Sequence, residues 1–272
     1  MGIGQRIGAF RPFLRSGKRF DSSAADRPLL VFEHVHKSYG PNRSVLRDLN
    51  LVIERGEFVF FTGPSGAGKS TLLKLIYAAE GPDSGRVLFL GKDVSRLRPS
   101  SIPYLRRNIG IIFQDFRLVS GWSVAENVAL PLQILGLPRR TVYNRVSEVL
   151  EQVGLGGRGG DPAGCLSGGE QQRAAIARAI VAEPALVLAD EPTGNLDPQL
   201  AFDVLELLED INQTGVSVVF ATHDRTLLDA HPRRVVVLDE GQTQDVPGGL
   251  RQVGHVLSPH AVQRPTTNWA VG

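Results

Sequence analysis

A glycine-rich segment with one lysine and one serine holds the side chains best suited to phosphate chemistry. It reads GPSGAGKS from Gly63 to Ser70 and matches the Walker A pattern G-x-x-x-x-G-K-[ST]. Its glycines let the backbone curl around phosphates, so that successive N–H groups point inward at the start of a helix. Lys69 can reach the outer phosphate oxygens, and the Ser70 hydroxyl can bind magnesium. The segment therefore predicts a site for a nucleoside triphosphate and Mg²⁺.

Two carboxylates and a histidine follow apolar runs later in the chain. The run ALVLADE ends on Asp190 and Glu191, and VSVVFAT leads directly to His223. Asp190 is suited to the magnesium shell, and Glu191 is placed to polarise an attacking water as general base. We expect His223 to hydrogen-bond the γ-phosphate and that water. The simpler alternatives are an acid pair that only caps a helix and a histidine that only ends a strand, and the upstream Walker A segment disfavours both.

The apolar pattern predicts the elements that position these groups. Leu29 to Val35 and Val45 to Ile53 indicate antiparallel strands, and Phe58 to Phe61 indicates a parallel strand before the phosphate loop. A helix is expected from Lys69 to Ala79. Beyond the acidic pair, helices and strands alternate to about Leu238, as a doubly wound α/β core requires.

Between residues 116 and 166 the apolar spacing becomes helical, which predicts a helical subdomain. The residues that share one face there are Val142, Val146, Val149, Leu150 and Val153.

A second candidate anion site lies at the start of another predicted helix. The segment LSGGEQQR runs from Leu166 to Arg173, and the helix is expected from Glu170 to Val181. Ser167 and the N–H groups of Gly168 and Gly169 would open this helix. Because helix N-termini carry free N–H groups and partial positive charge, this terminus can also bind a phosphate.

With these segments, the chain resembles the ATP-binding cassette (ABC) family over residues 29 to 240, and LSGG is the family's most diagnostic motif. The resemblance implies a P-loop NTPase of the α/β class. It implies a RecA-like core with a parallel sheet, an antiparallel β subdomain and a helical subdomain at about residues 116–166. In the family, the LSGG terminus meets the γ-phosphate held by the other subunit. Each chain then carries two half-sites, and catalysis implies an ATP-dependent, head-to-tail homodimer.

The resemblance also assigns roles to residues outside the phosphate loop. Tyr39 falls where the family stacks an aromatic ring on adenine, although aromatics near strands are mostly packing residues. Gln114, in IIFQD, matches the Q-loop glutamine, which contacts magnesium and water and senses the membrane partner. Asn195 to Asp197 matches the D-loop. Cys165 replaces the Gln or Glu usual before LSGG, in a loop one residue longer than expected, and we assign it no chemistry.

The complete set of expected site residues follows from these matches. The catalytic residues are Glu191, His223 and Gln114, and the magnesium ligands are Ser70, Gln114 and Asp190. The residues expected to bind ATP are Tyr39, Gly63, Pro64, Ser65, Gly66, Ala67, Gly68, Lys69, Ser70, Thr71, Ser167, Gly168, Gly169 and Asp197.

Three further segments resemble the cell-division branch of the family, FtsE. They are KSTLLKLI, GKDVSRL from Gly91 to Leu97, and IPYLRRNIGIIFQD from Ile102 to Asp115. The resemblance implies an integral membrane partner, FtsX, and ATP-driven regulation of septal peptidoglycan hydrolysis from the cytoplasmic face of the bacterial inner membrane. EPTGNLD, from Glu191 to Asp197, is shared with lipoprotein-releasing and macrolide-export ATPases, so these two functions remain alternatives. An ATP-dependent scaffold linking the membrane partner to cytoplasmic division-ring proteins is the alternative from another class.

The ends of the chain differ from its middle. Residues 1 to 20 hold five basic residues and no acidic one, whereas the whole chain is only +2, so the remainder is net acidic and does not indicate nucleic-acid binding. We expect residues 1–28 to form a disordered arm, with a lipid-surface segment or a transit peptide as alternatives. Residues 241–272 are expected to be a flexible tail. A single cysteine suits a reducing compartment, and no apolar run approaches a membrane span.

Overall fold

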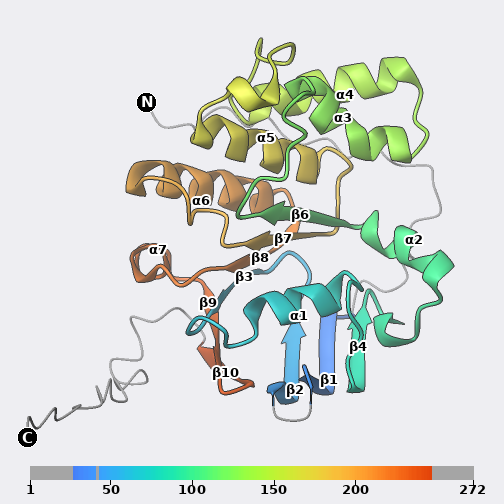
Figure 1. The fold of residues 1–272 in the computed structure, drawn as a ribbon, viewed down its shortest axis with the longest axis vertical. Helices are drawn as coiled ribbons and strands as arrows, with labels where there is room; N and C mark the ends of the chain where they lie inside the picture. The colour runs from blue at the N-terminus through green and yellow to red at the C-terminus, as the bar shows by residue number, and fades with distance from the viewer. Residues whose placement is uncertain (1–26, 41–42, 247–272) are drawn as a thin grey trace, which may run out of the picture.

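Two β-sheets frame the residues that the computed structural model describes, 27–40 and 43–246 (Figure 1). The smaller, antiparallel sheet has the order β2 (Ser44–Ile53), β1 (Leu30–Ser38), β4 (Ser84–Phe89), β5 (Lys92–Asp93). The larger sheet has the order β10 (Gln242–Val246), β9 (Arg234–Asp239), β3 (Phe58–Thr62), β8 (Ser217–Ala221), β7 (Leu186–Asp190), β6 (Ile109–Phe113). Its strands β9 to β6 are parallel, and only the edge strand β10 is antiparallel.

The parallel strands are apolar on both faces, which is why their sequences are nearly continuous hydrophobic runs. In β3, Phe58 and Phe60 pack into one hydrophobic core, whereas Val59 and Phe61 pack into a second core on the opposite face. The first core lies beneath α5 (Gly168–Ile180) and α6 (Pro198–Gln213), and the second contains α1 (Lys69–Ile76) (Figure 1). Helices thus cover both faces of the large sheet.

The register of the parallel strands brings their carboxyl ends to one edge. Phe113 pairs with Asp190, and Asp190 pairs with Ala221. The residues that follow these strands therefore emerge side by side, next to the loop that follows β3. In open α/β sheets this edge is where ligands bind.

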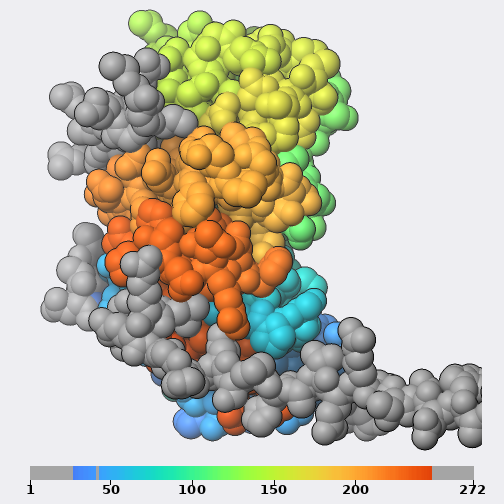
Figure 2. Space-filling view, turned by 90° about the vertical axis from the view of Figure 1, so that its left-hand side faces the viewer, coloured from blue at the N-terminus to red at the C-terminus, as the bar shows by residue number. Residues whose placement is uncertain are grey.

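A helical region joins β6 to α5. It contains α3 (Val124–Ile134), α4 (Arg139–Gln152) and the short turn η5 (Ala163–Cys165). The predicted apolar face of residues 142–153 is buried, which confirms the helical periodicity. Figure 2 shows this region at the top and α6 below it on the face turned to the viewer. The remaining short helices are α2 (Ile102–Arg106), α7 (Arg225–Ala230), η3 (Val94–Arg96) and η4 (Pro99–Ser101).

Element boundaries differ from the expectations at three places. The first helix ends at Ile76 rather than Ala79, because Ala78 takes a left-handed φ of 52°. The signature helix begins at Gly168, two residues earlier than expected. The expected tail is wrong at its start, because Gln242–Val246 forms β10. The rest of that tail, and all but the last two residues of the basic arm, lie outside the described residues.

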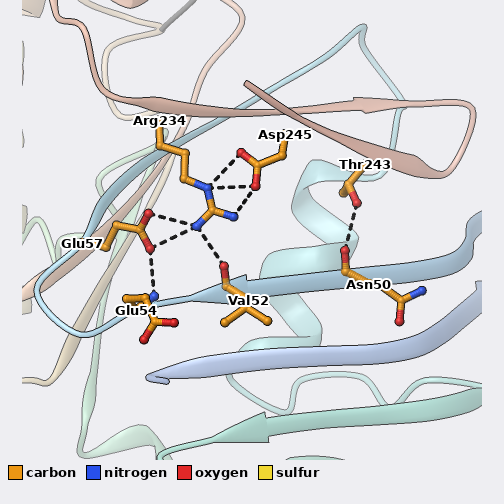
Figure 3. A network of polar contacts seen from close by, with 7 residues as sticks. All are labelled: Asn50, Val52, Glu54, Glu57, Arg234, Thr243 and Asp245. Atoms are coloured by element: carbon orange, nitrogen blue, oxygen red, sulfur yellow. Dashed lines mark hydrogen bonds and ion pairs between the residues drawn. The ribbon is translucent and has the colours of Figure 1, made fainter. Parts of the chain in front are cut away.

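The strand β10 lacks an apolar pattern because it is an edge strand held by backbone and ionic contacts. The Arg234 guanidinium donates to Asp245 on β10, to Glu57 before β3, and to the Val52 carbonyl on β2 at 2.9 Å (Figure 3). Thr243 adds a hydrogen bond to the Asn50 carbonyl. Arg234 therefore fastens the edge of the large sheet to the smaller sheet.

Across residues 27–40 and 43–246, no helix combines the length and the apolar character needed to cross a bilayer.

Candidate nucleotide site

The glycine-rich loop connects the buried end of β3 to α1. Gly63 has φ 146°, and a Cβ there would lie 2.1 Å from the Leu238 carbonyl oxygen. Gly68 has φ 109° and precedes Lys69 as the N-cap of α1, without a side-chain cap. Both positions need glycine because of their backbone angles and close neighbours. The first N–H groups of α1 thus face the loop and can bind phosphate oxygens.

Lys69 and Ser70 lie beside the acidic pair. The Lys69 Nζ donates to the Gly63 carbonyl at 2.8 Å and lies 3.8 Å from Glu191 Oε1. The Ser70 hydroxyl donates to Asp190 Oδ1 at 3.3 Å. The two halves of the phosphate site, separated by about 120 residues of sequence, therefore meet at the carboxyl edge of the sheet.

Glu191 is held in an uncommon backbone conformation that aims its carboxylate at this edge. Its φ is 47°, and its N–H donates to the Ala221 carbonyl at 3.0 Å. The ring Nδ1 of His223 lies 2.9 Å from Glu191 Oε2. A left-handed non-glycine residue persists only where its surroundings hold it, and such residues cluster at functional sites. Glu191 and His223 together can orient a water molecule and accept its proton.

Asp190 has the electrostatics of a cation ligand. Burial raises the pKa of its carboxyl, the adjacent Glu191 adds to the rise, and the hydrogen bond from Ser70 opposes it. A divalent cation would favour the ionised carboxylate. Hydroxyl and carboxylate oxygens are the hard donors that Mg²⁺ takes, and it usually uses one or two carboxylates together with waters and phosphates. The residues present fit this ion. Within the described ranges, no group of three or more His, Cys, Asp or Glu side chains could hold a metal by itself.

A cavity of about 590 Å³ opens above the glycine-rich loop. Its lining includes Tyr39, Lys69, Gln114, Glu191 and His223, together with most of the loop. A larger hollow of about 840 Å³ lies between α3 and α4, but no predicted site residue lines it. The smaller cavity therefore collects the phosphate-binding and hydrolytic groups.

Two further residues line the cavity that sequence reasoning missed, Arg43 and Val45. Arg43 precedes β2 and Val45 lies near its start, and their only sequence signal is their place between Tyr39 and the loop.

Tyr39 stands at the rim of this cavity with its hydroxyl engaged. The hydroxyl donates to the Glu80 carboxylate and lies 3.3 Å from Thr71 Oγ1. This hydrogen bond is the main reason why the pKa of Glu80 is lowered. The hydroxyl end thus anchors the ring beside α1.

The signature residues lie outside this cavity. Ser167 is the N-cap of α5: the Glu170 carboxylate accepts from the Ser167 N–H at 2.9 Å and from its hydroxyl at 2.8 Å. Arg158 Nη1 donates to Glu170 Oε1 at 2.5 Å. Asp197 accepts from Leu200 N at 3.1 Å as the N-cap of α6. One chain therefore does not bring Ser167 or Asp197 to the cavity that holds Lys69.

The atypical loop before the signature forms a regular turn. The segment Ala163–Cys165 is the 3₁₀ turn η5, and the Cys165 N–H donates to the Pro162 carbonyl at 2.9 Å. The extra residue is accommodated there, and the Ser167 cap is formed. The thiol of Cys165 is exposed.

Comparison with known proteins agrees with this geometry. Residues 46–194 match the family model described as ABC transporter. The chain is 48% identical over 215 residues to the cell division ATP-binding protein FtsE of Mycobacterium tuberculosis, covering 79% of this chain and 94% of the relative. It is 46% identical over 227 residues to FtsE of Escherichia coli, covering 84% of this chain and 100% of the relative.

Two solved structures share the fold. The dimeric post-hydrolysis state of the ATP-binding cassette MJ0796, bound to ADP and Pi, is 33% identical, with a TM-score of 0.73 over 80% of this chain and 98% of that chain. The structure of cbiO1 from Clostridium perfringens, part of the ABC transporter complex cbiONQ, is 33% identical, with a TM-score of 0.76 over 83% of this chain and 90% of that chain.

The two sheets, the glycine-rich loop and the acidic pair beside it define an ABC ATPase, a cassette that binds and hydrolyses ATP. Within that class, the chain belongs to the family of the cell division ATP-binding protein FtsE.

Proposed function

We propose that this chain is the ATP-hydrolysing subunit of a cell-division ABC complex whose membrane partner resembles FtsX. Two copies close head-to-tail on ATP and reopen after hydrolysis, and this movement regulates septal peptidoglycan hydrolases across the membrane. The observation that carries the proposal is the contact of Glu191 with both Lys69 and His223 at the cavity, in a chain of the FtsE family.

The predicted site residues have distinct tasks in this proposal. Lys69 and the loop N–H groups bind the β- and γ-phosphates. Glu191 accepts the proton of the attacking water, and His223 orients that water against the γ-phosphate. Ser70, Asp190 and Gln114 would hold Mg²⁺, which supplies charge neutralisation of the phosphates. Tyr39 stacks on adenine from the rim.

The head-to-tail dimer is supported by the position of the signature. Ser167, Gly168 and Gly169 open α5 away from the cavity of their own chain, so the N–H groups of Gly168 and Gly169 can serve the γ-phosphate held by a second copy. In this arrangement Asp197, in the D-loop, also lies at the interface between the two copies.

The partner is proposed to dock on the loop that follows Gln114. Phe116 is half-buried there and Val119 is 42% exposed. Leu118, in contrast, packs partly against the core of the helical region, so it serves the fold as well. Apolar side chains that stay partly exposed on a loop next to a site favour a docking role for that loop. The proposed location is the cytoplasmic face of the bacterial inner membrane, with division-ring proteins as further partners and no nucleic acid.

A complementation experiment tests the proposal against its alternatives. In bacteria depleted of FtsE, the wild-type chain expressed with its cognate FtsX should restore septation, and the Glu191→Gln variant should not. Restoration by Glu191→Gln would instead support an ATP-dependent scaffold that needs no hydrolysis. Failure of the wild-type chain there, with rescue of cells that lack a lipoprotein-releasing or macrolide-export ATPase, would reassign the chain to those systems.

A further inference from the structure

The side chain of Arg178, near the end of α5, lies against the backbone of the loop that follows Gln114. Its Nη1 donates to the Arg117 carbonyl at 2.5 Å, and its Nη2 donates to the Phe116 carbonyl at 2.7 Å. The planar guanidinium thus holds two consecutive carbonyl oxygens with two separate nitrogens. We call this contact the Arg178 clamp.

The loop held by the Arg178 clamp has a backbone that needs external support. Phe116 has φ 56° and Arg117 has φ 50°, so two consecutive non-glycine residues are left-handed. Each such residue is strained, because its Cβ crowds the following carbonyl oxygen, and it persists only when its surroundings enforce it. The Arg117 guanidinium also lies 3.8 Å from the centroid of the Phe113 ring, which ties the end of the loop to its start.

Gln114 is therefore held from two directions. Asn195 Nδ2, from the segment after the acidic pair, donates to the main-chain carbonyl of Gln114 at 3.0 Å. The Arg178 clamp fixes the backbone two residues further on. The side chain of Gln114 lines the nucleotide cavity, so both contacts set where its amide lies relative to the phosphates.

The charge of Arg178 is poorly compensated in this position. The side chain is half-buried, its Nη1 and Nη2 contact neutral carbonyls, and burial lowers the pKa of its guanidinium. Half-burial of a charge without a carboxylate partner costs free energy, and hydrogen bonds such as these two offset part of that cost. This cost indicates that the two carbonyl contacts matter to the loop.

The helix that carries Arg178 also contacts the other parts of the hydrolytic machinery. It begins at the Ser167 cap and runs for 13 residues, about 20 Å. In its first half, the fully buried Gln172 donates from Nε2 to the Pro192 carbonyl at 2.6 Å, one residue after Glu191. A single rigid helix thus joins the signature, the general-base loop and the Gln114 loop.

We propose that Arg178 is a positioning residue for hydrolysis, which sets Gln114 through the clamp and ties its position to that of the signature helix. Arg178 itself does not line the cavity and would not touch ATP. The proposal rests on the role of Gln114 in the proposed function. Removing the clamp should therefore slow turnover without weakening the binding of ATP to the glycine-rich loop.

The experiment compares Arg178→Gln and Arg178→Lys with a matched control, Arg106→Gln. Arg106 clamps the Tyr77 and Ala78 carbonyls at 3.0 and 3.1 Å, and Ala78 is also left-handed, but this turn lies at the far end of α1. Arg178→Gln should lower kcat about tenfold with KM changed less than about twofold, because small misplacements of a positioned group are costly. The kcat of Arg178→Lys should lie between those of the wild type and Arg178→Gln. Arg106→Gln should keep the wild-type kcat.

Hydrogen exchange and a double-mutant cycle decide the mechanism. Amides of residues 113–120 should exchange faster in both Arg178 variants, and unchanged exchange would overturn the clamp. If Arg178 acts through Gln114, the Gln114→Ala/Arg178→Gln double variant should be no slower than Gln114→Ala alone. Additive losses of kcat in the double variant would contradict the positioning role of Arg178 but not the catalytic role of Gln114. A wild-type kcat in Gln114→Ala would instead count against the proposed function. Should Arg178→Gln not fold, the Arg178→Lys variant carries the same cycle.

Discussion

At the residue scale, the chemistry depends on the short distances from the Glu191 carboxylate to Lys69 and His223. Their contacts of 3.8 and 2.9 Å place one carboxylate between a phosphate-binding cation and an imidazole. A carboxylate in that position can accept a proton while the lysine holds the phosphate.

The first prediction tests Glu191 as general base. Glu191→Gln keeps the shape of the side chain but removes its basicity, so hydrolysis should fall by about 10²- to 10⁴-fold. The variant should still bind ATP and should accumulate as an ATP-bound dimer, measured by size exclusion with radiolabelled ATP. Lys69→Ala is the contrasting variant, because it should lose nucleotide binding. Near-normal turnover of Glu191→Gln would remove that residue from the mechanism.

The second prediction follows from the raised pKa of Asp190. A carboxyl whose folded pKa lies above its unfolded value binds protons more tightly in the folded state. Its ionised form therefore destabilises the fold at neutral pH, and this penalty fades as the pH falls through the raised pKa. Asp190→Asn should raise Tm at pH 7.5 in Mg²⁺-free buffer, and the gain should shrink on acidification. The same variant should lose about 10²-fold or more of its Mg²⁺-dependent hydrolysis. A Tm gain that does not depend on pH would contradict this assignment.

At the element scale, the structure connects surface strands and loops through single side chains. Arg234 holds β10 and the smaller sheet to the large sheet, and its hydrogen bonds to Asp245 raise its pKa above the usual value (Figure 3). Its neighbour Arg233 contacts Glu209 at 3.1 Å and is more exposed.

The third prediction compares these adjacent arginines. Arg234→Met leaves Glu57 and Asp245 without their shared cation, so it should lower the free energy of unfolding by about 2 kcal/mol. Arg233→Met removes a more exposed ion pair and should cost about 0.5 kcal/mol. Urea denaturation measures both. Equal losses in the two variants would show that the Arg234 network adds nothing beyond an ordinary surface pair.

The fourth prediction concerns the loop that follows Gln114. Phe116→Ala keeps the backbone carbonyl that Arg178 binds, so ATP binding by the isolated chain should stay intact. The variant should co-purify several-fold less with FtsX and should lose the effect of FtsX on hydrolysis. Tyr143→Ala, at a 73% exposed aromatic on α4, is the control and should change neither. Unaltered FtsX binding by Phe116→Ala would move the interface elsewhere. Leu118 is unsuitable for this test because it packs against the core.

At the scale of the whole molecule, one copy presents a phosphate cavity and a signature terminus that do not face each other. Lys69 lies in the cavity, whereas Ser167 opens α5 outside it. A second copy is therefore needed to complete the site in the proposed dimer.

The fifth prediction mixes two defective chains. Ser167→Arg should spare ATP binding by the monomer but abolish ATP-dependent dimerisation and hydrolysis. Mixed with Lys69→Ala chains, it should regain a fraction of wild-type hydrolysis, because both defects fall in one composite site and the other site stays intact. Ser123→Arg is the matched control, since Ser123 caps α3 through the same type of capping box and lies outside the site. Normal hydrolysis by Ser167→Arg alone would contradict the composite site.

The sequence by itself determined the parts of this protein that depend on local pattern. The glycine spacing, the continuous apolar runs and the helical periodicity of residues 142–153 each specify an element over fewer than about 15 residues. The strand ends then place Gln114, Glu191 and His223 at one edge, because parallel strands share their direction. These features predicted the α/β fold and most of the cavity.

Only the tertiary structure decided the contacts between segments far apart in the chain. The Arg178 clamp joins residues about 60 positions apart, and the contacts of Arg234 to Val52 and Glu57 join residues about 180 apart. The edge strand β10 has no apolar alternation, since its stability comes from pairing with β9 and from the contact between Arg234 and Asp245. Arginine side chains carry no periodic signal, and which carbonyls or carboxylates they reach depends on the packing of the elements that carry them.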